Sequence, residues 1–518
     1  MPNFKPDNYD QTVMMVLNFL DQLELDRFAF TLHHLIDNRI DLSAFHEKYK
    51  NDGGGRAAYN PSIMLKIILF AYSKGIRSSR DIQWHCANNM MFKSLSCDSV
   101  PHWTSIANFI SAYPDAIESV FEQVLMTCDQ AGLLGHELLA IDGCKMSSNA
   151  AKEHSGTLEE FKQKREKIRK RIQHCMKEHK KLDKRKPRER ERKERLEQQL
   201  ASLDKHFEKI DQFLKIATPR KGQGKRSKEV KSNITDNESA KMTTSKGTIQ
   251  GYNGIATVDK KHQIIVDAQA FGEGQEHHTL QPVLESVKAT YQRTGISEDV
   301  FAEGIIVTAD TGYSNEDNNA YLKEEGIDAY IPDNKFRSRD PKFKHQKTRH
   351  GKRHQDKVVG IQAVIPASAF TFNPKMKTCV CPAGNTMWLK SETTHGADRS
   401  KLAFEGKLTD CRRCALKHDC MRNPASADTR EGHGRQVSFT VSTGRSATEW
   451  MMRRVDSALG KHYYSHRMSV VEPVFANIGT NKGLNRFTLR GKQKVQGQWR
   501  LYCMVHNIEK LMRYGAIT

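Results

Sequence analysis

The chain has 518 residues, which is too long for one ordinary core, so the length predicts two to four folded units. The net charge is +21 and 37% of the residues are hydrophobic, and no apolar run approaches the roughly 20 residues of a membrane span, which excludes a membrane protein. The N-terminus lacks the apolar segment of a secretory signal, so we expect a cytoplasmic protein whose 11 cysteines stay reduced unless they bind metal.

The excess positive charge is concentrated in two segments. Residues 161–230 hold 26 Lys and Arg against 11 Asp and Glu, and residues 335–357 hold 10 against 2. Two basic segments on a nearly neutral body favour a polyanion such as nucleic acid as the partner. The alternative is surface charge that only contacts solvent.

Residues 1–130 are predicted to form a helical domain. Pro61 suits the start of a first helix that Gly75 ends. Ser78 is expected to cap a second helix, and Pro101 to open a third. Short helices with tight turns are typical of DNA-binding helix-turn-helix units and of small bundles, and the sequence leaves both open.

Residues 131–156 are predicted to contain the first strand of an α/β core. The apolar run Leu138–Ile141 ends at Asp142, and a second run of the same kind, Ile305–Ala309, ends at Asp310. Both look like buried strands that deliver a carboxylate to a sheet edge. An unpaired carboxylate is costly there, so such residues usually hold a metal, meet a base or cap the next element.

Residues 157–230 are predicted to form a basic helical hairpin inserted after the first strand. Pro187 argues against one unbroken helix, because proline removes a backbone donor and clashes one turn back. The seam between the two helices is predicted from Ile168, Ile172, Met176, Leu196, Leu200, Leu203, Phe207 and Ile210. A spacer that joins two copies and an arm that grips DNA both fit this pattern.

The core is predicted to continue over residues 231–333. Two strands joined at Asp259–Lys261 form an antiparallel pair, and a helix near 278–294 precedes the strand that ends at Asp310. A helix near 316–325 and a final strand follow. This order is ribonuclease-H-like. The predicted fold class is therefore α/β: a ribonuclease-H-like mixed sheet with a helical N-terminal domain, a basic helical-hairpin insertion and a cysteine-rich insertion.

Residues 334–445 are predicted to form the second insertion, which begins with a basic loop. Phe336 and Phe343 lie among its cations, a composition that suits phosphates and unstacked bases. A solvated loop is the alternative. The candidate DNA-binding residues of this loop are Lys342, Lys344, Arg349, Lys352 and Arg353.

The rest of this insertion is rich in cysteine. A Cys-Pro-x-Gly turn and a Cys-x-x-Cys pair can each direct thiolates at a tetrahedral zinc ion. We expect one structural Zn²⁺, with Cys379 or His418 as replacement ligands and reduced cysteines without metal as the alternative. The four predicted ligands are Cys381, Cys411, Cys414 and Cys420.

Residues 446–518 are predicted to be helical, to complete the core and to supply a third acid, Glu472. Pro473 follows it, so a kink or a helix start is expected there. Hydrolysis of a phosphodiester requires deprotonated water and stabilised phosphate charge, which two Mg²⁺ or Mn²⁺ ions provide when carboxylates hold them. Asp142, Asp310 and Glu472 are therefore the predicted catalytic residues and Mg²⁺ ligands.

Six ordered motifs carry a resemblance to a known family. They are Tyr59-Asn60-Pro61 with Gly75–Arg80, Ala140-Ile141-Asp142-Gly143, Asp236–Met242 leading into Gly251-Tyr252-Asn253, Ala309–Tyr313, Val471–Phe475 and Lys494–Trp499. In these motifs the chain resembles bacterial insertion-sequence transposases with a DDE catalytic domain, in the subgroup with a helical N-terminal domain. The resemblance implies metal-dependent cleavage at transposon ends, followed by attack of the freed 3′-hydroxyl on target DNA.

The wider group shows a signature of Tyr, Arg, Glu and Lys. Tyr464 and Arg467 keep its first spacing, whereas Glu472 comes one residue late and Lys482 three residues after the expected position. The resemblance makes Tyr464, Arg467 and Lys482 candidates for DNA contacts.

The resemblance also implies the partners of the chain. They are double-stranded DNA, as terminal inverted repeats and target, and further copies of the chain in a homodimer or higher oligomer. We expect no membrane partner and a nucleoid-associated location in the bacterial cytoplasm. Two alternative hypotheses are a non-catalytic, zinc-containing DNA-binding protein that acts as a repressor, and a metal-dependent nuclease that does not join ends.

Overall fold

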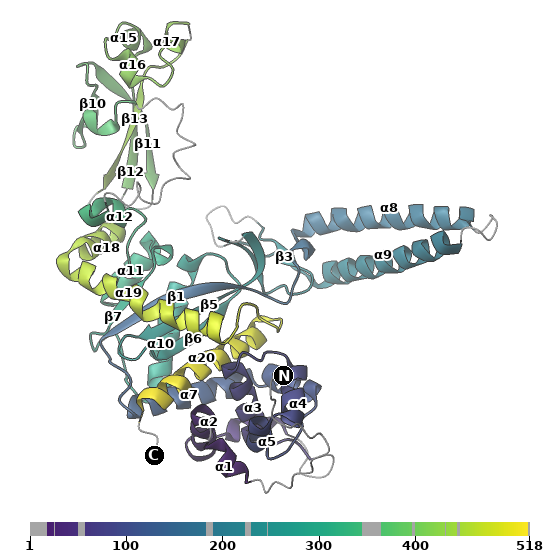
Figure 1. Cartoon of the computed structure of the whole chain (residues 1–518). Coiled ribbons are helices and arrows are strands. Elements are labelled where there is room, and N and C mark those ends of the chain that lie inside the picture. Colours follow the sequence, from purple (N-terminus) through teal and green to yellow (C-terminus); the bar gives the residue numbers. More distant parts are fainter. Residues whose placement is uncertain are drawn as a thin grey trace, which may run out of the picture. The chain divides into compact units, whose positions relative to one another are not determined.

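The computed structural model describes residues 18–24, 26–49, 57–182, 190–222, 229–245, 247–343, 364–395, 399–429, 431–442 and 446–515 (Figure 1). The chain divides into two compact units. Unit 1 combines residues 1–309 with residues 465–518, and unit 2 comprises residues 310–464. No helix among the described residues is both long and apolar enough to span a membrane.

Unit 1 begins with short helices, and two of the three predicted starts are confirmed, whereas the third helix begins at Trp103, two residues after Pro101. Pro61 is the first residue of its helix, and the Ser78 side chain accepts a hydrogen bond from the Asp81 amide of the next. Gly75 has φ +75°, a conformation that glycine adopts without strain at a helix end. The helices are α1 (Phe19–Leu23), α2 (Arg27–Asn38), α3 (Pro61–Ser73), α4 (Ser79–Asn88), α5 (Met90–Ser96), α6 (Trp103–Ala112) and α7 (Pro114–Gln130).

The N-terminal helices share a core with the C-terminal helix α20 (Lys492–Tyr514). Helices α2, α3, α6 and α7 all contact α20, which Figure 1 shows in yellow next to the purple N-terminal helices. Tyr72 of α3 stacks on Tyr502 of α20 with 4.3 Å between the ring centroids. The N-terminal helices therefore form a bundle around α20.

A mixed sheet forms the centre of unit 1. Strand β1 lies between β5, to which it is antiparallel, and β7, to which it is parallel. Strand β6 pairs with β5 in the predicted antiparallel hairpin, and β4 pairs with the start of β5. The elements are β1 (Leu138–Ser147), β4 (Ala240–Thr244), β5 (Gly247–Asp259), β6 (Ile265–Phe271), α10 (Leu280–Thr294) and β7 (Ile306–Ala309).

Two side chains of α20 hydrogen-bond to the backbone of β6. The Gln496 amide accepts from the Ala270 N–H at 2.5 Å and donates to the Ala268 carbonyl oxygen. The Asn507 amide accepts from the Ile265 N–H and donates to the Ile265 carbonyl oxygen, both at 2.8 Å. The helix thus satisfies buried peptide groups of β6 that the pairing with β5 does not use.

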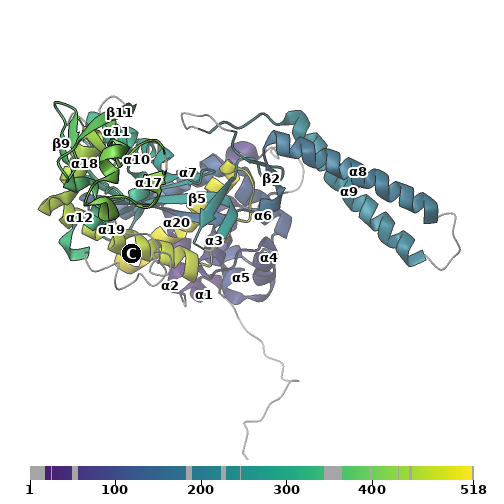
Figure 2. The ribbon, with the colours of Figure 1, turned by 90° about the horizontal axis from the view of Figure 1, so that it is seen from above.

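The basic insertion is a helical hairpin of α8 (Leu158–Leu182) and α9 (Arg190–Ile216), which lie side by side in Figures 1 and 2. Pro187 lies outside the described residues. The predicted seam is wrong at Met176, which is 50% exposed, because the seam continues from Ile172 to Cys175, three residues on. One face of a helix repeats at steps of three and four residues, whereas the predicted seam used only steps of four from Ile168 to Met176.

Helix α19 (Ala458–Ala476) corrects the expectation of a helix start at Glu472. The helix runs through Pro473 without a new start. Proline cannot donate to the carbonyl oxygen four residues earlier, which belongs to Ser469. The Gln263 side chain donates to that oxygen instead, at 2.9 Å. A side chain from elsewhere in unit 1 therefore replaces the missing helical hydrogen bond.

Unit 2 contains a five-stranded antiparallel sheet in the order β13-β12-β11-β10-β9, with short helices after β12. Its sheet strands are β9 (Thr371–Asn373), β10 (Thr378–Val380), β11 (Thr386–His395), β12 (Arg399–Glu405) and β13 (Gln436–Ser442). The other elements include α11 (Glu316–Glu324), β8 (Ala329–Tyr330), α12 (Phe336–Arg339), α15 (Leu408–Arg412), α16 (Lys417–Cys420), α17 (Ser426–Thr429) and α18 (Ala447–Asp456).

We predict that Gln496→Leu lowers the free energy of unfolding by about 2–4 kcal/mol, because it leaves the buried Ala270 N–H and Ala268 carbonyl without a partner. Chemical denaturation measures the change. Gln493→Leu is the matched control, since Gln493 is exposed on the same helix and the same substitution there should change stability by less than about 0.5 kcal/mol. Equal effects of the two substitutions would contradict the assigned role of Gln496.

Candidate functional site

The pairing of two neighbouring strands of the sheet in unit 1 ends directly before the two predicted aspartates. Strands β1 and β7 run parallel, and their register pairs Ile141 with Ala309. Asp142 follows Ile141 directly, and Asp310 is bonded to Ala309. Because consecutive Cα atoms lie about 3.8 Å apart, the Cα atom of Asp310 is about 3.8 Å from that of Ala309, the last residue of β7.

Asp142 forms an ion pair with an arginine of α19. Arg467 Nη1 lies 3.0 Å from Asp142 Oδ2, and the other carboxylate oxygen accepts from the Gly143 N–H at 2.8 Å. The side chains are 9% and 24% exposed for Arg467 and Asp142, so water screens the pair only in part. Burial, together with the negative charge of Asp142, raises the pKa of the nearby Cys144 thiol. The guanidinium therefore neutralises the carboxylate at this strand end.

Glu472 is exposed on α19. It lies five residues beyond Arg467, which corresponds to about 140° around an α-helix. No three His, Cys, Asp or Glu side chains in the described ranges are arranged to hold a metal ion, and this includes the three predicted acids and the four predicted cysteines.

The remaining candidates for DNA contact have different environments. Lys482 is only 1% exposed, its Nζ lies 2.5 Å from Glu509 Oε1, and burial lowers its pKa. An ammonium in this position cannot reach a phosphate, which corrects the predicted contact. In unit 2 the Tyr464 ring packs edge-on against Phe336, and Lys342 is exposed. Four further candidates lie outside the described residues: Lys344, Arg349, Lys352 and Arg353.

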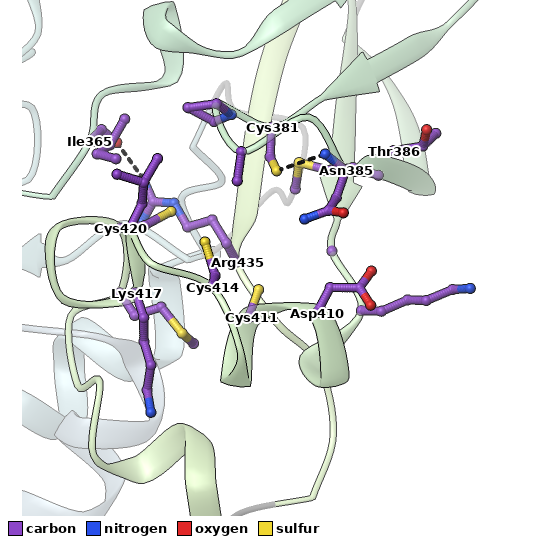
Figure 3. Close-up of a pocket in the computed structure, with 17 residues that line it drawn as sticks. Ile365, Cys381, Asn385, Thr386, Asp410, Cys411, Cys414, Lys417, Cys420 and Arg435 are labelled. Atoms are coloured by element: carbon purple, nitrogen blue, oxygen red, sulfur yellow. Dashed lines mark hydrogen bonds between the residues drawn. The ribbon is translucent and has the colours of Figure 1, made fainter.

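The four predicted zinc ligands line one cavity of about 30 Å³ in unit 2 (Figure 3). Cys381 follows β10, Cys411 lies in α15, Cys414 follows α15, and Cys420 ends α16. Figure 3 shows sulfur atoms from all three segments at this cavity. Cys379 is buried beside the Met387 sulfur, 3.9 Å away, and does not line the cavity.

Two further features of the cavity concern Cys411 and Arg435. A Cβ atom at Gly434 would lie 2.7 Å from Cys411 Sγ, so the glycine leaves room for this thiol. The Nε of Arg435 is buried and has no hydrogen-bond acceptor among the described residues. Burial raises the pKa of the Cys420 thiol, and the charge of Arg435 opposes that shift. A cationic donor therefore faces a group of thiols.

The pairing of Arg467 with Asp142 was not predictable from the sequence, because the two residues are far apart in the chain and only the family signature marked Arg467. Three arginines of unit 1 were not predicted either, namely Arg77, Arg486 and Arg490, which line two adjoining pockets. These arginines lie outside the two basic segments. Counting charge along the chain could not find them.

Comparison with protein families gives two matches. Residues 17–112 match a transposase domain (DUF772), and residues 380–512 match a transposase DDE domain. The first match covers most of the N-terminal helices, and the second includes the four cysteines of the cavity, Arg467 and Glu472. Neither includes Asp142 or Asp310. A search of curated proteins gives no match.

We predict that Arg467→Gln and Asp142→Asn have coupled effects on stability. Removal of either charge abolishes the ion pair, so the double variant should differ from the sum of the single variants by about 1–2 kcal/mol. Chemical denaturation of the four proteins gives this coupling. Arg500→Gln is the matched control, since buried Arg500 pairs with Glu118, and its effect should be additive with that of Asp142→Asn. Additivity of Arg467→Gln and Asp142→Asn would contradict the pairing.

Proposed function

Since the chain belongs to the insertion-sequence transposases of the DDE class, we propose that it cleaves DNA strands at transposon ends and joins the freed 3′-hydroxyl to target DNA. The observation that carries the proposal is the parallel register of β1 and β7. Ile141 is paired with Ala309 in this register, and Asp142 and Asp310 are the residues that follow them. The strand order β6-β5-β1-β7, with β1 antiparallel to β5 and parallel to β7, supports a ribonuclease-H-like core.

The donor set suits hard divalent cations such as Mg²⁺ or Mn²⁺, because carboxylate oxygens are their preferred protein ligands. Asp142 already binds a cationic group, since Arg467 Nη1 lies 3.0 Å from its Oδ2. Asp142 and Asp310 would hold the metal, which stabilises phosphate charge and activates the attacking oxygen. Two ions would require a further ligand, and Glu472, exposed on the helix of Arg467, is our candidate.

The residues themselves have separate roles in this proposal. Asp142 and Asp310 provide negative charge on two rigid strand ends, where little reorganisation is needed. Arg467 holds the Asp142 side chain in place, and its guanidinium would also suit a DNA phosphate. Glu472 completes the cation site and accepts a proton from the attacking hydroxyl. Double-stranded DNA is the substrate, and we propose that a homodimer or higher oligomer brings two ends together.

We predict that Asp142→Asn and Asp310→Asn each reduce strand cleavage by more than about 100-fold, because the amide keeps the shape but loses the charge that holds the cation. Binding of the element's end should be retained. Gel-shift and nicking assays with Mg²⁺ on the same preparations measure both, and Ca²⁺ should support binding without cleavage. Asp317→Asn, at an exposed position in α11, is the matched control.

The outcomes separate the competing readings. Substantial cutting by either Asn variant would remove that residue from the site. Cleavage without joined products would favour the nuclease reading. Tight binding that needs no metal and gives no nicking in the unsubstituted protein would favour the repressor reading.

A structural zinc in unit 2 is a separate part of the proposal. The segment with α15, α16 and α17 has helices of five, four and four residues, and its buried cluster contains only Leu408, Met421 and Ala427. So small an apolar cluster rarely holds a fold, and metals commonly stabilise such segments. Zinc would have to draw the cysteines closer than they now lie. The resulting anionic centre would give the buried Arg435 Nε an acceptor.

We predict about one zinc ion per chain in protein purified without added metal, because four thiolates complete a tetrahedral site. Elemental analysis measures it. Cys414→Ser should lose the zinc, whereas Cys379→Ser, the matched control in the same unit, should keep it because Cys379 does not line the cavity. Folded, active protein without zinc would contradict this part of the proposal.

A further inference from the structure

Two adjoining pockets in unit 1 form a groove that none of the residues of the proposed cleavage site lines. The first pocket has a volume of about 650 Å³ and the second about 620 Å³, and Asn149 and Arg486 line both. The end of β1, the base of α9 and the residues that follow α3 contribute to the walls. The segment around Arg486 joins the sheet here, since Arg486 bridges Ser147 of β1 in parallel register. We call the two pockets together the β1 groove.

Three arginines of the β1 groove are held by uncharged oxygens. Arg486 donates to the Ser148 carbonyl at 3.3 Å and to Asn149 Oδ1 at 3.0 Å. Arg490 donates to the Asn149 carbonyl at 2.7 Å. Arg77 donates at 2.7 Å to the carbonyl oxygen of Gly483 and to the Asn485 side chain. Each guanidinium is thus oriented by the protein without losing its charge.

None of these three arginines forms an ion pair with a carboxylate in the described ranges. Other arginines of unit 1 do, because Arg165 pairs with Asp211, and Arg293 and Arg500 both pair with Glu118. Three oriented guanidiniums that no ion pair compensates among the described residues therefore line the β1 groove. Oriented guanidiniums with free donors are the usual ligands of phosphate groups.

Two lysines add to this charge. Lys152 and Lys209 line the first pocket, and Asp81 is the one acid among the residues that line either pocket. His154, in the same wall, has its pKa lowered by burial and by the nearby positive groups His206, Lys164 and Lys209. Five cations from four segments of the chain exceed what one small anion needs. They suit an extended polyanion.

The position of the groove along β1 relates it to the cleavage site. Ser147 lies five residues after Asp142 on the same strand, which is about 17 Å at the rise of a β-strand. That length corresponds to about five base pairs of B-DNA. We infer that the β1 groove binds the sugar-phosphate backbone of duplex DNA about five base pairs from the phosphodiester that is cut at Asp142. The assignment of the cut rests on the proposed function.

This inference also bears on the helical hairpin. Lys209 belongs to α9, so the base of the hairpin forms part of the groove wall. The end of the hairpin next to the sheet would then contact DNA, and this contact does not depend on what the outer turns of α8 and α9 bind. A hairpin that served only as a spacer between two copies would have no role in the groove.

The test measures how salt weakens binding of a duplex that carries the element's own end. Each phosphate contact adds roughly −0.9 to the slope of log K against log salt concentration. Arg486→Gln with Arg490→Gln should therefore reduce the slope by about 1.8. Lys152→Gln with Lys209→Gln is a second variant, chosen because these exposed lysines support no backbone group. It should reduce the slope by a similar amount without any effect on folding.

The matched control is Arg39→Gln with Arg513→Gln, two exposed arginines of unit 1 that line neither pocket. This control should leave the slope unchanged. A duplex truncated to three base pairs beyond the cut should be bound equally well by all variants, because it does not reach the groove. Unchanged slopes in both groove variants on the full duplex would overturn the inference.

The outcomes also distinguish this inference from the proposed function. If the unsubstituted protein cleaves its ends with Mg²⁺ but the groove variants keep the full slope, the groove assignment fails and the transposase proposal stands. If the slopes fall as expected but no Mg²⁺-dependent cleavage occurs, the groove binds DNA and the catalytic proposal fails.

Discussion

The edge of a β-sheet carries N–H and C=O groups that need partners, and in unit 1 the helix α20 supplies them to β6. The Gln496 amide bonds to the end of β6 at Ala270, and the Asn507 amide bonds to its start at Ile265. Two side chains, more than two helical turns apart, therefore attach α20 to the strand. The same helix forms the centre of the N-terminal bundle, with Tyr502 stacked on Tyr72. The docking of α20 therefore joins the helices of the first transposase match to the sheet that carries Asp142, although these segments are hundreds of residues apart.

The arginines of unit 1 fall into two groups, and the difference explains how one unit can hold a carboxylate site and also attract a polyanion. Arg467 forms an ion pair with Asp142 and neutralises its charge. The carboxylate would therefore repel a DNA phosphate less strongly. Arg77, Arg486 and Arg490 are instead oriented by carbonyl and amide oxygens and keep their full charge. Negative and positive regions then lie along one strand, β1, with the acid near its middle and the arginines at its end.

The sequence predicted elements well where local chemistry decides them. Helix starts at Pro61 and Ser78, the β5–β6 hairpin and the two-helix insertion all followed from caps, alternation and a proline. Prediction from the sequence failed where contacts between distant residues determine the structure. Gln263 allows α19 to continue through Pro473, and Glu509 draws Lys482 into the interior. For the site, the parallel strand ends were predictable from two apolar runs, but the distance between Arg467 and Asp142 was not, because no local pattern links a strand end to a helix more than 300 residues later.

The Asp142–Arg467 pair also bears on whether the chain catalyses or only binds. A partly buried ion pair contributes little net stability, since the cost of removing two charges from water offsets most of their attraction, and well-packed apolar residues usually serve as well. A protein that only bound DNA would need the arginines of the β1 groove but would gain nothing from a carboxylate on the same strand. A protein that holds a divalent cation would need that carboxylate, and Arg467 neutralises its charge when no cation is bound. The charge arrangement along β1 is thus better explained by catalysis on DNA than by binding alone.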